Sequence, residues 1–421
     1  MDGLPGRGRP TWPIMMQRHQ RSLLLAATLS VILIVTLIPS WSGERGSFIT
    51  CPICEERGLA DVVLNILLFV PFGLVLGQFG KRQHHVLIVS ALLSAGIEFA
   101  QSYIPGRDAA AFDIVFNTAG AAVGVILARR TRAWLLPSCA TGNRLSLASA
   151  FAAVGILALV GYLLGPAPAR SSSYTLWTPR AGLAVQYEGE VVNAVFGTMK
   201  IVPPGTVPTK SVTALLTASG ELRVQVVPAS LQSGFRPVIA ISDEGGREIV
   251  LLGLQGDDLV FRYRTRSASV RLDRPDFRFV GAMRDAVPGK ITEIAVLRES
   301  QGYCMSVDEK RACTYGFTVG DGWALLLHPD GLASPVHTLL ASVWLAVLFL
   351  PGGYWAVGRW VRALSASLLV LGLLVTPQLS GLLPTRPVEI AAGLTGFLSG
   401  IALRRATETI ASQQNQRGIR A

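Results

Sequence analysis

Residues 61–80 read DVVLNILLFVPFGLVLGQFG, and Lys81 and Arg82 follow directly. After its first residue the stretch is almost entirely apolar, and a helix needs about 17–25 such residues to cross the hydrocarbon core. A pair of basic residues at the end of such a run is typical of a cytoplasmic loop. This stretch therefore predicts a membrane span whose polar start, at Asp61, lies on the opposite side.

Seven further stretches have the same character. The eight predicted spans are about 22–38, 62–80, 86–104, 111–128, 146–165, 335–351, 360–380 and 387–403. The first could be a signal peptide, but Pro39-Ser40-Trp41 is a poor cleavage site, so we expect an uncleaved span. The chain is 50% hydrophobic and only 15% charged, which excludes a single large soluble enzyme.

The basic residues predict the orientation of these spans. They lie at the N-terminus and in every second connection, at Lys81, Arg82, Arg129, Arg130, Arg132, Arg359, Arg362, Arg404 and Arg405. All these segments then face the cytoplasm. We expect a multi-pass protein of the inner (plasma) membrane with both termini cytoplasmic. The net charge of +11 reflects this topology, and without a basic patch interleaved with aromatic residues no nucleic-acid partner is expected.

One long polar stretch interrupts the spans and divides the chain into three parts, 1–165, 166–334 and 335–421. The second part, 166–334, contains short runs in which apolar and polar residues alternate, such as LRVQV at 222–226 and LVFRYR at 259–264. Turn residues separate these runs. Short alternating runs between turns are typical of β-strands. We therefore expect an α-helical polytopic membrane protein of about eight spans with an inserted all-β extracytoplasmic sandwich, of the jelly-roll type.

Two pairs of cysteines lie on the predicted outer side. Cys304 and Cys313 could form a disulfide that staples a hairpin around Asp308, or they could be two reduced buried thiols. Cys51 and Cys54 form a C-x-x-C, for which a local disulfide is favoured because neither further zinc ligands nor a thioredoxin-like context lies nearby. Acidic turns in the insert are more often solvated than calcium-binding. No metal and no cofactor is expected.

The second to fourth spans carry polar residues that are costly in lipid. They are Asp61, Asn65, Glu98, Gln101, Arg107, Asp113 and Asn117. The spacings of three, four and seven residues place these groups on one face of each helix, and the topology places them at the outer side. They could form a site in which Arg107 grips an anion and Glu98 or Asp113 acts as a base, or they could only join the helices by hydrogen bonds.

These residues also carry a resemblance to a known family. All of them except Asp61, together with Phe69, Pro71, Gly73, Gly120 and Gly124, resemble the VanZ-like membrane proteins over about residues 20–130. The family is named for a protein of low-level teicoplanin resistance. The resemblance implies a role in cell-envelope or lipid-linked glycan biology, and lectin-like inserts are known in this family.

The stretch Gly320-Asp321-Gly322-Trp323, together with the rhythm of the strands, resembles laminin-G or concanavalin-like lectin domains. The resemblance implies glycan binding by the insert. Some relatives hydrolyse glycans with paired carboxylates on one strand. Glu188-Gly189-Glu190 is the nearest candidate here, but no third acid follows, so we favour binding.

The last span also echoes the fourth. The offsets that lead from Asp113 to Asn117, Gly120, Gly124 and Arg129 lead from Glu389 to Gly393, Gly396, Gly400 and Arg405. This indicates either a degenerate repeat or a chance likeness of glycine-rich helices. A true repeat could bring Glu389 and Arg386 near the site of the fourth span.

Two functions remain open. In the first, the protein binds a glycan through its insert and a lipid or partner through its spans. In the second, it is a membrane enzyme or transporter for a lipid-linked anionic (phosphate-bearing) precursor at the outer leaflet. The first is slightly favoured because no catalytic motif is complete, and the sequence leaves open whether the protein is an enzyme.

Overall fold

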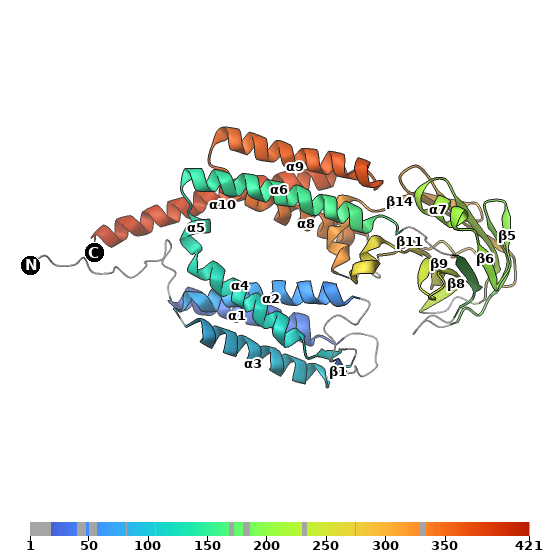
Figure 1. Ribbon diagram of the computed structural model, residues 1–421, viewed down its shortest axis with the longest axis horizontal. Coiled ribbons are helices and arrows are strands. Elements are labelled where there is room, and N and C mark those ends of the chain that lie inside the picture. Colours follow the sequence, from blue (N-terminus) through green and yellow to red (C-terminus); the bar gives the residue numbers. More distant parts are fainter. Residues whose placement is uncertain are drawn as a thin grey trace, which may run out of the picture. The chain divides into compact units, whose positions relative to one another are not determined.

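The computed structural model describes residues 18–39, 48–49, 57–80, 82–105, 107–167, 172–179, 186–229, 234–273, 275–327 and 334–420 (Figure 1). The chain forms two compact units. The first consists of residues 1–150, 349–367 and 394–421, and the second of residues 151–348 and 368–393. Four long helices have residues in both units.

The N-terminal part of the first unit is a bundle of helices. Its elements are α1 (Arg18–Leu37), α2 (Gly58–Gln78), α3 (Gln83–Gln101), α4 (Asp113–Arg129) and α5 (Thr131–Leu135), with the short parallel strands β1 (Phe48–Ile49) and β2 (Ala109–Ala110). The long helices that reach into both units are α6 (Cys139–Leu164), α8 (Ser334–Trp355), α9 (Arg359–Ser380) and α10 (Pro387–Arg420).

Six helices within the described residues are long and apolar enough to cross a membrane: α1, α2, α3, α6, α8 and α9. The chain is thus a multi-pass membrane protein by six candidate spans, whereas the predicted count was eight. Helices form at the other two predicted spans, but α4 has only 17 residues, and α10 has 34 residues in all and ends in a polar tail. A membrane span is recognised by its length and by its continuous apolar character. Both features therefore make α4 and α10 weaker candidates for spans.

Helices α2 and α4 pack with their backbones in contact. A Cβ atom on Gly124 would lie 2.2 Å from the carbonyl oxygen of Val70, and one on Gly120 would lie 2.2 Å from that of Ile66. On the facing helix, a Cβ on Gly73 would lie 2.1 Å from the oxygen of Ala121. Only glycine permits this approach, which is the packing role predicted for the glycines of α4.

Helices α8 and α10 repeat this contact. A Cβ on Gly400 would lie 2.2 Å from the oxygen of Leu350, and one on Gly353 would lie 1.8 Å from that of Phe397. The facing helices share a sequence as well, since FVPFG at 69–73 of α2 corresponds to FLPGG at 349–353 of α8. The likeness of α4 and α10 thus extends to their partner helices and to the contacts that join each pair.

The second unit contains a sandwich of two six-stranded antiparallel sheets, in the orders β11-β10-β9-β8-β3-β6 and β14-β13-β12-β7-β4-β5. The first sheet consists of β3 (Ser173–Trp177), β6 (Gly205–Val207), β8 (Phe235–Ser242), β9 (Glu248–Gln255), β10 (Asp258–Tyr263) and β11 (Phe277–Phe279). The second consists of β4 (Glu190–Phe196), β5 (Met199–Ile201), β7 (Glu221–Val227), β12 (Thr292–Arg298), β13 (Tyr303–Val307) and β14 (Lys310–Tyr315). The prediction of a β-sandwich is confirmed.

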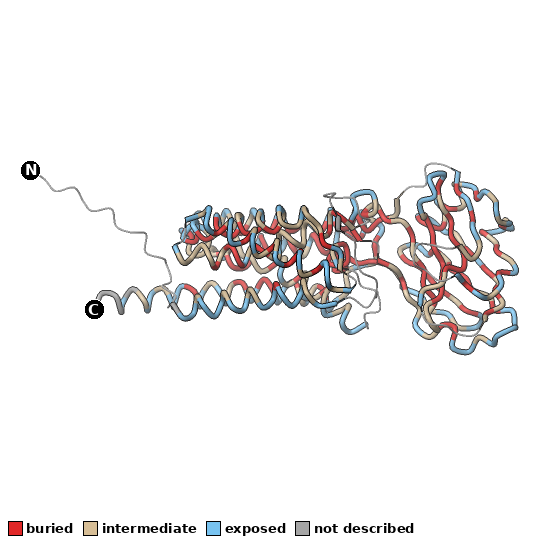
Figure 2. Tube along the Cα trace, turned by 90° about the horizontal axis from the view of Figure 1, so that it is seen from below, coloured by how far each residue is buried: buried red, intermediate tan, exposed pale blue. Residues whose placement is uncertain are grey.

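Alternating side chains fill the space between the sheets, as the period of a strand requires. In β7, Leu222, Val224 and Val226 are buried while Arg223 is exposed. Figure 2 shows buried residues along the inside of the sandwich. Aromatic rings complete this core, with ring centroids of Phe261 and Tyr303 5.0 Å apart. Helix α7 (Thr209–Thr217) and the 3-10 helices η1 (Arg266–Val270) and η2 (Val319–Leu325) connect the strands and the helices.

Candidate functional site

The predicted polar residues of the first unit gather where three helices begin or end. Asp61 lies in the first turn of α2, Asp113 in the first turn of α4, and Glu98 in the last turn of α3. Glu98 is only 5% exposed, and its Oε2 accepts a 2.7 Å hydrogen bond from the backbone N–H of Ala110 in β2. The short strand after α3 therefore holds this carboxylate in place.

Asp113 interacts with side chains of both neighbouring helices. It hydrogen-bonds the side chain of Asn65 on α2, and Asp61 and Glu98 both lie close enough to repel it. One turn deeper, Nδ2 of Asn117 donates a 2.9 Å hydrogen bond to Oγ of Ser94 on α3. The Oδ1 atom of Asn117 is buried and without a partner in the described structure.

Gln101 and Arg107 form hydrogen bonds to the C-terminal end of α1. Nε2 of Gln101 donates to the carbonyl oxygen of Thr36 at 3.0 Å. Arg107 donates from Nε to the oxygen of Ile38 and from Nη2 to that of Val35, both at 2.9 Å. The last carbonyls of a helix have no partner within the helix and carry partial negative charge, so the guanidinium caps the end of α1.

The structure thus brings Asp61, Asn65, Glu98, Asp113 and Asn117 into one cluster, whereas Gln101 and Arg107 bind the end of α1. Ser94 belongs to the cluster but was missed by sequence reasoning. Its spacing from Glu98 and Gln101, four and seven residues, placed it on the same helix face and could have revealed it. We call Asp61, Asn65, Ser94, Glu98, Asp113 and Asn117 the amide–carboxylate cluster.

The carboxylates of Asp61, Glu98 and Asp113 make this cluster acidic. Carboxylate and amide oxygens accept hydrogen bonds from hydroxyl and ammonium groups. Two of the acids also stabilise their own helices, since a negative charge in the first turn offsets the helix dipole. The arrangement suits a hydroxyl-rich or cationic group better than a phosphate.

A second buried acidic group lies in the second unit. Oε1 of Glu389, a fully buried residue in the first turn of α10, accepts a 2.7 Å hydrogen bond from the hydroxyl of Thr318. Oε2 of Glu389 accepts from the backbone N–H of Arg386 at 2.9 Å. A true repeat would bring Glu389 and Arg386 near the fourth span, which stays a prediction; within the second unit, Glu389 binds Thr318 and the backbone of Arg386.

Asp321 completes this second group. Its Oδ2 accepts from the backbone N–H of Thr318 at 2.7 Å, and its Oδ1 lies 3.7 Å from Nδ1 of His337 on α8. Burial raises the pKa of Asp321, and the neighbouring His337 opposes this shift. Asp321 belongs to the predicted Gly-Asp-Gly-Trp stretch, in which a Cβ on Gly320 would lie 2.5 Å from Oε1 of Glu389. This stretch therefore packs against α10.

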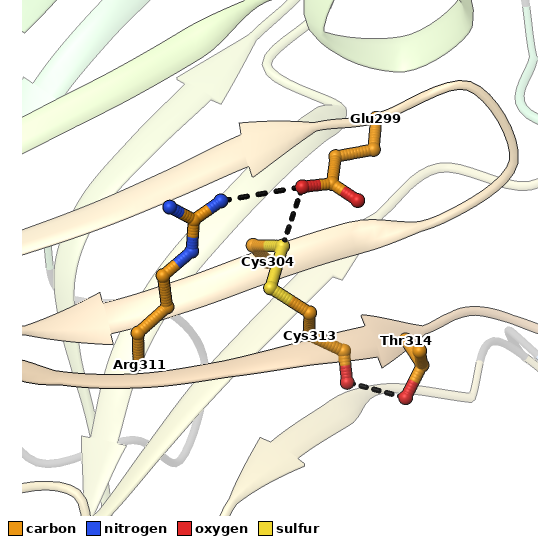
Figure 3. Close-up of a disulfide and its surroundings, with 5 residues drawn as sticks. All are labelled: Glu299, Cys304, Arg311, Cys313 and Thr314. Atoms are coloured by element: carbon orange, nitrogen blue, oxygen red, sulfur yellow. Dashed lines mark hydrogen bonds and ion pairs between the residues drawn. A yellow bond between two sulfur atoms is a disulfide. The ribbon is translucent and has the colours of Figure 1, made fainter.

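Cys304 of β13 and Cys313 of β14 are joined by a disulfide (Figure 3). The hairpin between them turns at Asp308, which has a positive φ of 48°. Glu299 lies beside the disulfide, with its Oε1 3.0 Å from Sγ of Cys304 and 3.2 Å from Nη2 of Arg311. Glu299, Cys304 and Cys313 have the spacing of metal ligands, but both sulfurs are engaged in the disulfide. Cys51 and Cys54 lie outside the described residues.

The acidic turns of the sandwich are paired with arginines. Oδ2 of Asp243 lies 3.0 Å from both Arg247 and Arg264. Burial would raise the pKa of Asp243, but the hydrogen bonds and charges of these arginines hold it below its ordinary value. Of the paired acids considered for hydrolysis, Glu188 lies 3.8 Å from Arg236, and Glu190 is exposed at the start of β4.

Comparison with known proteins finds a family match in the N-terminal part of the chain. Residues 12–135 match the family model described as VanZ/LLP1. The matched segment contains α1 to α5 and the whole amide–carboxylate cluster. No curated protein and no solved structure matches the chain. Residues 12–135 of this membrane protein are thus similar to the VanZ/LLP1 family.

Proposed function

We propose that this chain is an integral membrane protein of the bacterial cell envelope that binds a glycan through its sandwich and a lipid or partner through its spans. The observation that carries the proposal is the sandwich of two six-stranded sheets inserted between the membrane helices α6 and α8. Paired antiparallel sheets of this kind are the architecture of lectin domains. The VanZ/LLP1 segment supports a role in the envelope.

The proposed topology has eight spans, with both termini in the cytoplasm and the sandwich outside. The six candidate spans and the basic loops support it. Helices α4 and α10 would be the remaining spans, because each packs through glycines against a candidate span, α2 or α8. A disulfide in the sandwich is in keeping with an oxidising outer compartment.

Cysteine labelling of intact cells tests this topology. Lys290→Cys places a thiol on an exposed turn of the sandwich, and Ser412→Cys places one on the exposed face of the α10 tail. A membrane-impermeant maleimide should label the first before lysis and the second only after lysis, relative to the parent chain. Labelling of Ser412→Cys in intact cells, or protection of Lys290→Cys, would overturn the proposed orientation.

Glycan binding is tested with the full-length protein in detergent. Immobilised peptidoglycan, teichoic acid and lipopolysaccharide provide the main envelope glycans, and binding is measured by surface plasmon resonance. We expect saturable binding to one class that competes with its soluble oligosaccharide. If none of the three classes binds, the lectin role of the sandwich is wrong.

The second candidate function is an enzyme or transporter for a lipid-linked envelope precursor. The convergence of Asp61, Glu98 and Asp113 favours it, because buried acids in membrane helices often mark substrate or proton pathways. The test expresses the protein in a teicoplanin-susceptible bacterium and measures the inhibitory concentration. If Glu98→Gln abolishes a resistance that the parent chain confers, at equal membrane abundance, the cluster is a working site. Glu408→Gln on the exposed α10 tail is the matched control.

A further inference from the structure

The short helix η1 of the sandwich is fastened to the end of membrane helix α6. The backbone N–H of Arg266 donates to the oxygen of Gly165 at 3.0 Å, and that of Ala167 donates to the oxygen of Arg264 at 2.9 Å. Nη1 of Arg266 reaches the oxygen of Tyr162 at 3.1 Å. Backbone and side-chain bonds together fix η1 at the level where α6 ends.

The depth of that level follows from the sequence of α6. Arg144 and Leu164 are 20 residues apart, and the segment between them carries no charged residue. At about 1.5 Å per residue this segment is about 30 Å long, which is the thickness of the hydrocarbon core. Tyr162 and Gly165 therefore lie at the boundary between hydrocarbon and headgroups, and so does η1.

The side chains of η1 suit this boundary. The guanidinium of Arg266 lies 4.7 Å from the ring centroid of Tyr162, which is itself 58% exposed. Tyrosine is enriched at membrane interfaces because its ring is apolar and its hydroxyl is polar. At the far end of η1, Val270 is 42% exposed and Arg271 is also exposed. An apolar side chain between two arginines can enter the headgroup layer while the arginines meet phosphates.

The backbone at Arg271 supports a role for its side chain. This residue has a φ of 57°, in the left-handed region that glycine or asparagine adopts more readily. An arginine in this position costs conformational energy, which points to a use for its long cationic side chain. The run from Arg264 to Leu272 also contains three arginines and no acid.

We propose that the segment Arg266–Arg271 is a lipid-contact surface that binds the phosphate groups of anionic phospholipids in the leaflet at which α6 ends. Arginine suits phosphate because its planar fork donates two parallel hydrogen bonds. The contact would orient the sandwich on the membrane surface. It is independent of any glycan bound by the sandwich and goes beyond the proposed function.

Hydrogen exchange of the full-length protein in nanodiscs tests this proposal. Discs of phosphatidylcholine are compared with discs that also contain phosphatidylglycerol, and exchange is followed in peptides that cover 266–272. We expect exchange to slow several-fold in the anionic discs, and high salt should reverse the effect since it screens charges near the surface. Equal exchange in both lipids would overturn the proposal.

Two variants separate charge recognition from structure. Arg271→Gln should remove most of the difference between the two lipids, whereas Lys200→Gln, an exposed cation on the edge strand β5, should leave it unchanged. Peptides of the buried strand β9 report whether each variant keeps the sandwich folded. If Arg271→Gln retains the full lipid-dependent protection with β9 intact, Arg271 does not bind headgroups and the proposal fails.

Discussion

The hydroxyl of Thr318 donates a 2.7 Å hydrogen bond to Oε1 of Glu389, two residues separated by 71 positions in the chain. Thr318 follows the last strand of the sandwich, and Glu389 lies in the first turn of α10. Both residues are fully buried. This bond therefore fastens the end of the inserted segment to the C-terminal helix without exposure to solvent.

Loss of this bond should loosen the junction. Glu389→Ala removes the acceptor of the Arg386 N–H and leaves the hydroxyl of Thr318 only its longer bond, 3.3 Å, to Oδ2 of Asp321. A buried group that loses its partner costs about 1–3 kcal/mol. We expect a clear fall in the melting temperature of the detergent-solubilised protein. Glu408→Ala, on the same helix but 49% exposed, is the control and should change the melting temperature little. Equal effects of the two variants would contradict the structural role of Glu389.

Asp321 should make stability depend on pH. Burial raises the pKa of this carboxyl group in the folded state, so the folded protein holds a proton that the unfolded chain releases. The stabilisation is complete below the unfolded pKa of about 3.9 and is lost as the pH rises through the folded pKa. The melting temperature should fall over this window, and Asp321→Asn should flatten the fall. An unchanged profile in Asp321→Asn would show that another group is responsible.

We expect Arg107 to contribute to the stability of the folded protein through its bonds to the end of α1. Its two hydrogen bonds to the oxygens of Ile38 and Val35 require the guanidinium fork, which lysine lacks. Arg107→Lys keeps the charge and should still lower the melting temperature, whereas Arg129→Lys, at an exposed hydrogen bond to Gln83, should not. If Arg107→Lys keeps full stability but Arg107→Gln loses ligand binding, the anion-binding interpretation from the sequence would be favoured.

Local patterns predicted the sandwich and most spans because period and length are properties of a single segment. The alternation in 222–226 became β7, and the apolar run after Asp61 became α2. The order of strands in the two sheets could not be predicted, since it depends on pairing between distant segments. For example, β7 pairs with β12, which begins 71 residues after Glu221, the first residue of β7.

The site was predicted less fully because composition shows which groups are polar but not their partners. Glu98 and Asp113 were found through their cost in lipid, yet the use of Arg107 at the end of α1 depends on a fold that no local pattern encodes. Thr318 and His337 gave no signal at all, since threonine and histidine near a helix end are ordinary. Their importance arises only where Asp321 and Glu389 meet them.

The disulfide should stabilise the hairpin of β13 and β14. Cys304 and Cys313 are nine residues apart, and closure of a short loop in the unfolded chain contributes about 2–4 kcal/mol in the chain-entropy model. Cys304→Ala with Cys313→Ala should therefore lower the melting temperature under oxidising conditions and reduce its response to dithiothreitol. Cys139→Ala, at an exposed free cysteine, is the control and should retain that response.

The glycine contacts provide the sharpest test of the repeated helix pairs. Gly124→Ala and Gly400→Ala each place a Cβ 2.2 Å from a carbonyl oxygen of the facing helix, at Val70 and Leu350. The helices must separate, and overpacking of this kind costs about 1–3 kcal/mol or more. Both variants should lower the melting temperature to a similar degree, because the two contacts are alike.

Gly96→Ala is the matched control for this pair. Gly96 lies within α3, and a Cβ at this position meets nothing within 4 Å. Alanine should be tolerated there or stabilise by up to about 1 kcal/mol, since it is a better helix former than glycine. If Gly400→Ala behaves like Gly96→Ala while Gly124→Ala unfolds the protein, then α8 and α10 do not pack as α2 and α4 do, and the repeat is restricted to sequence.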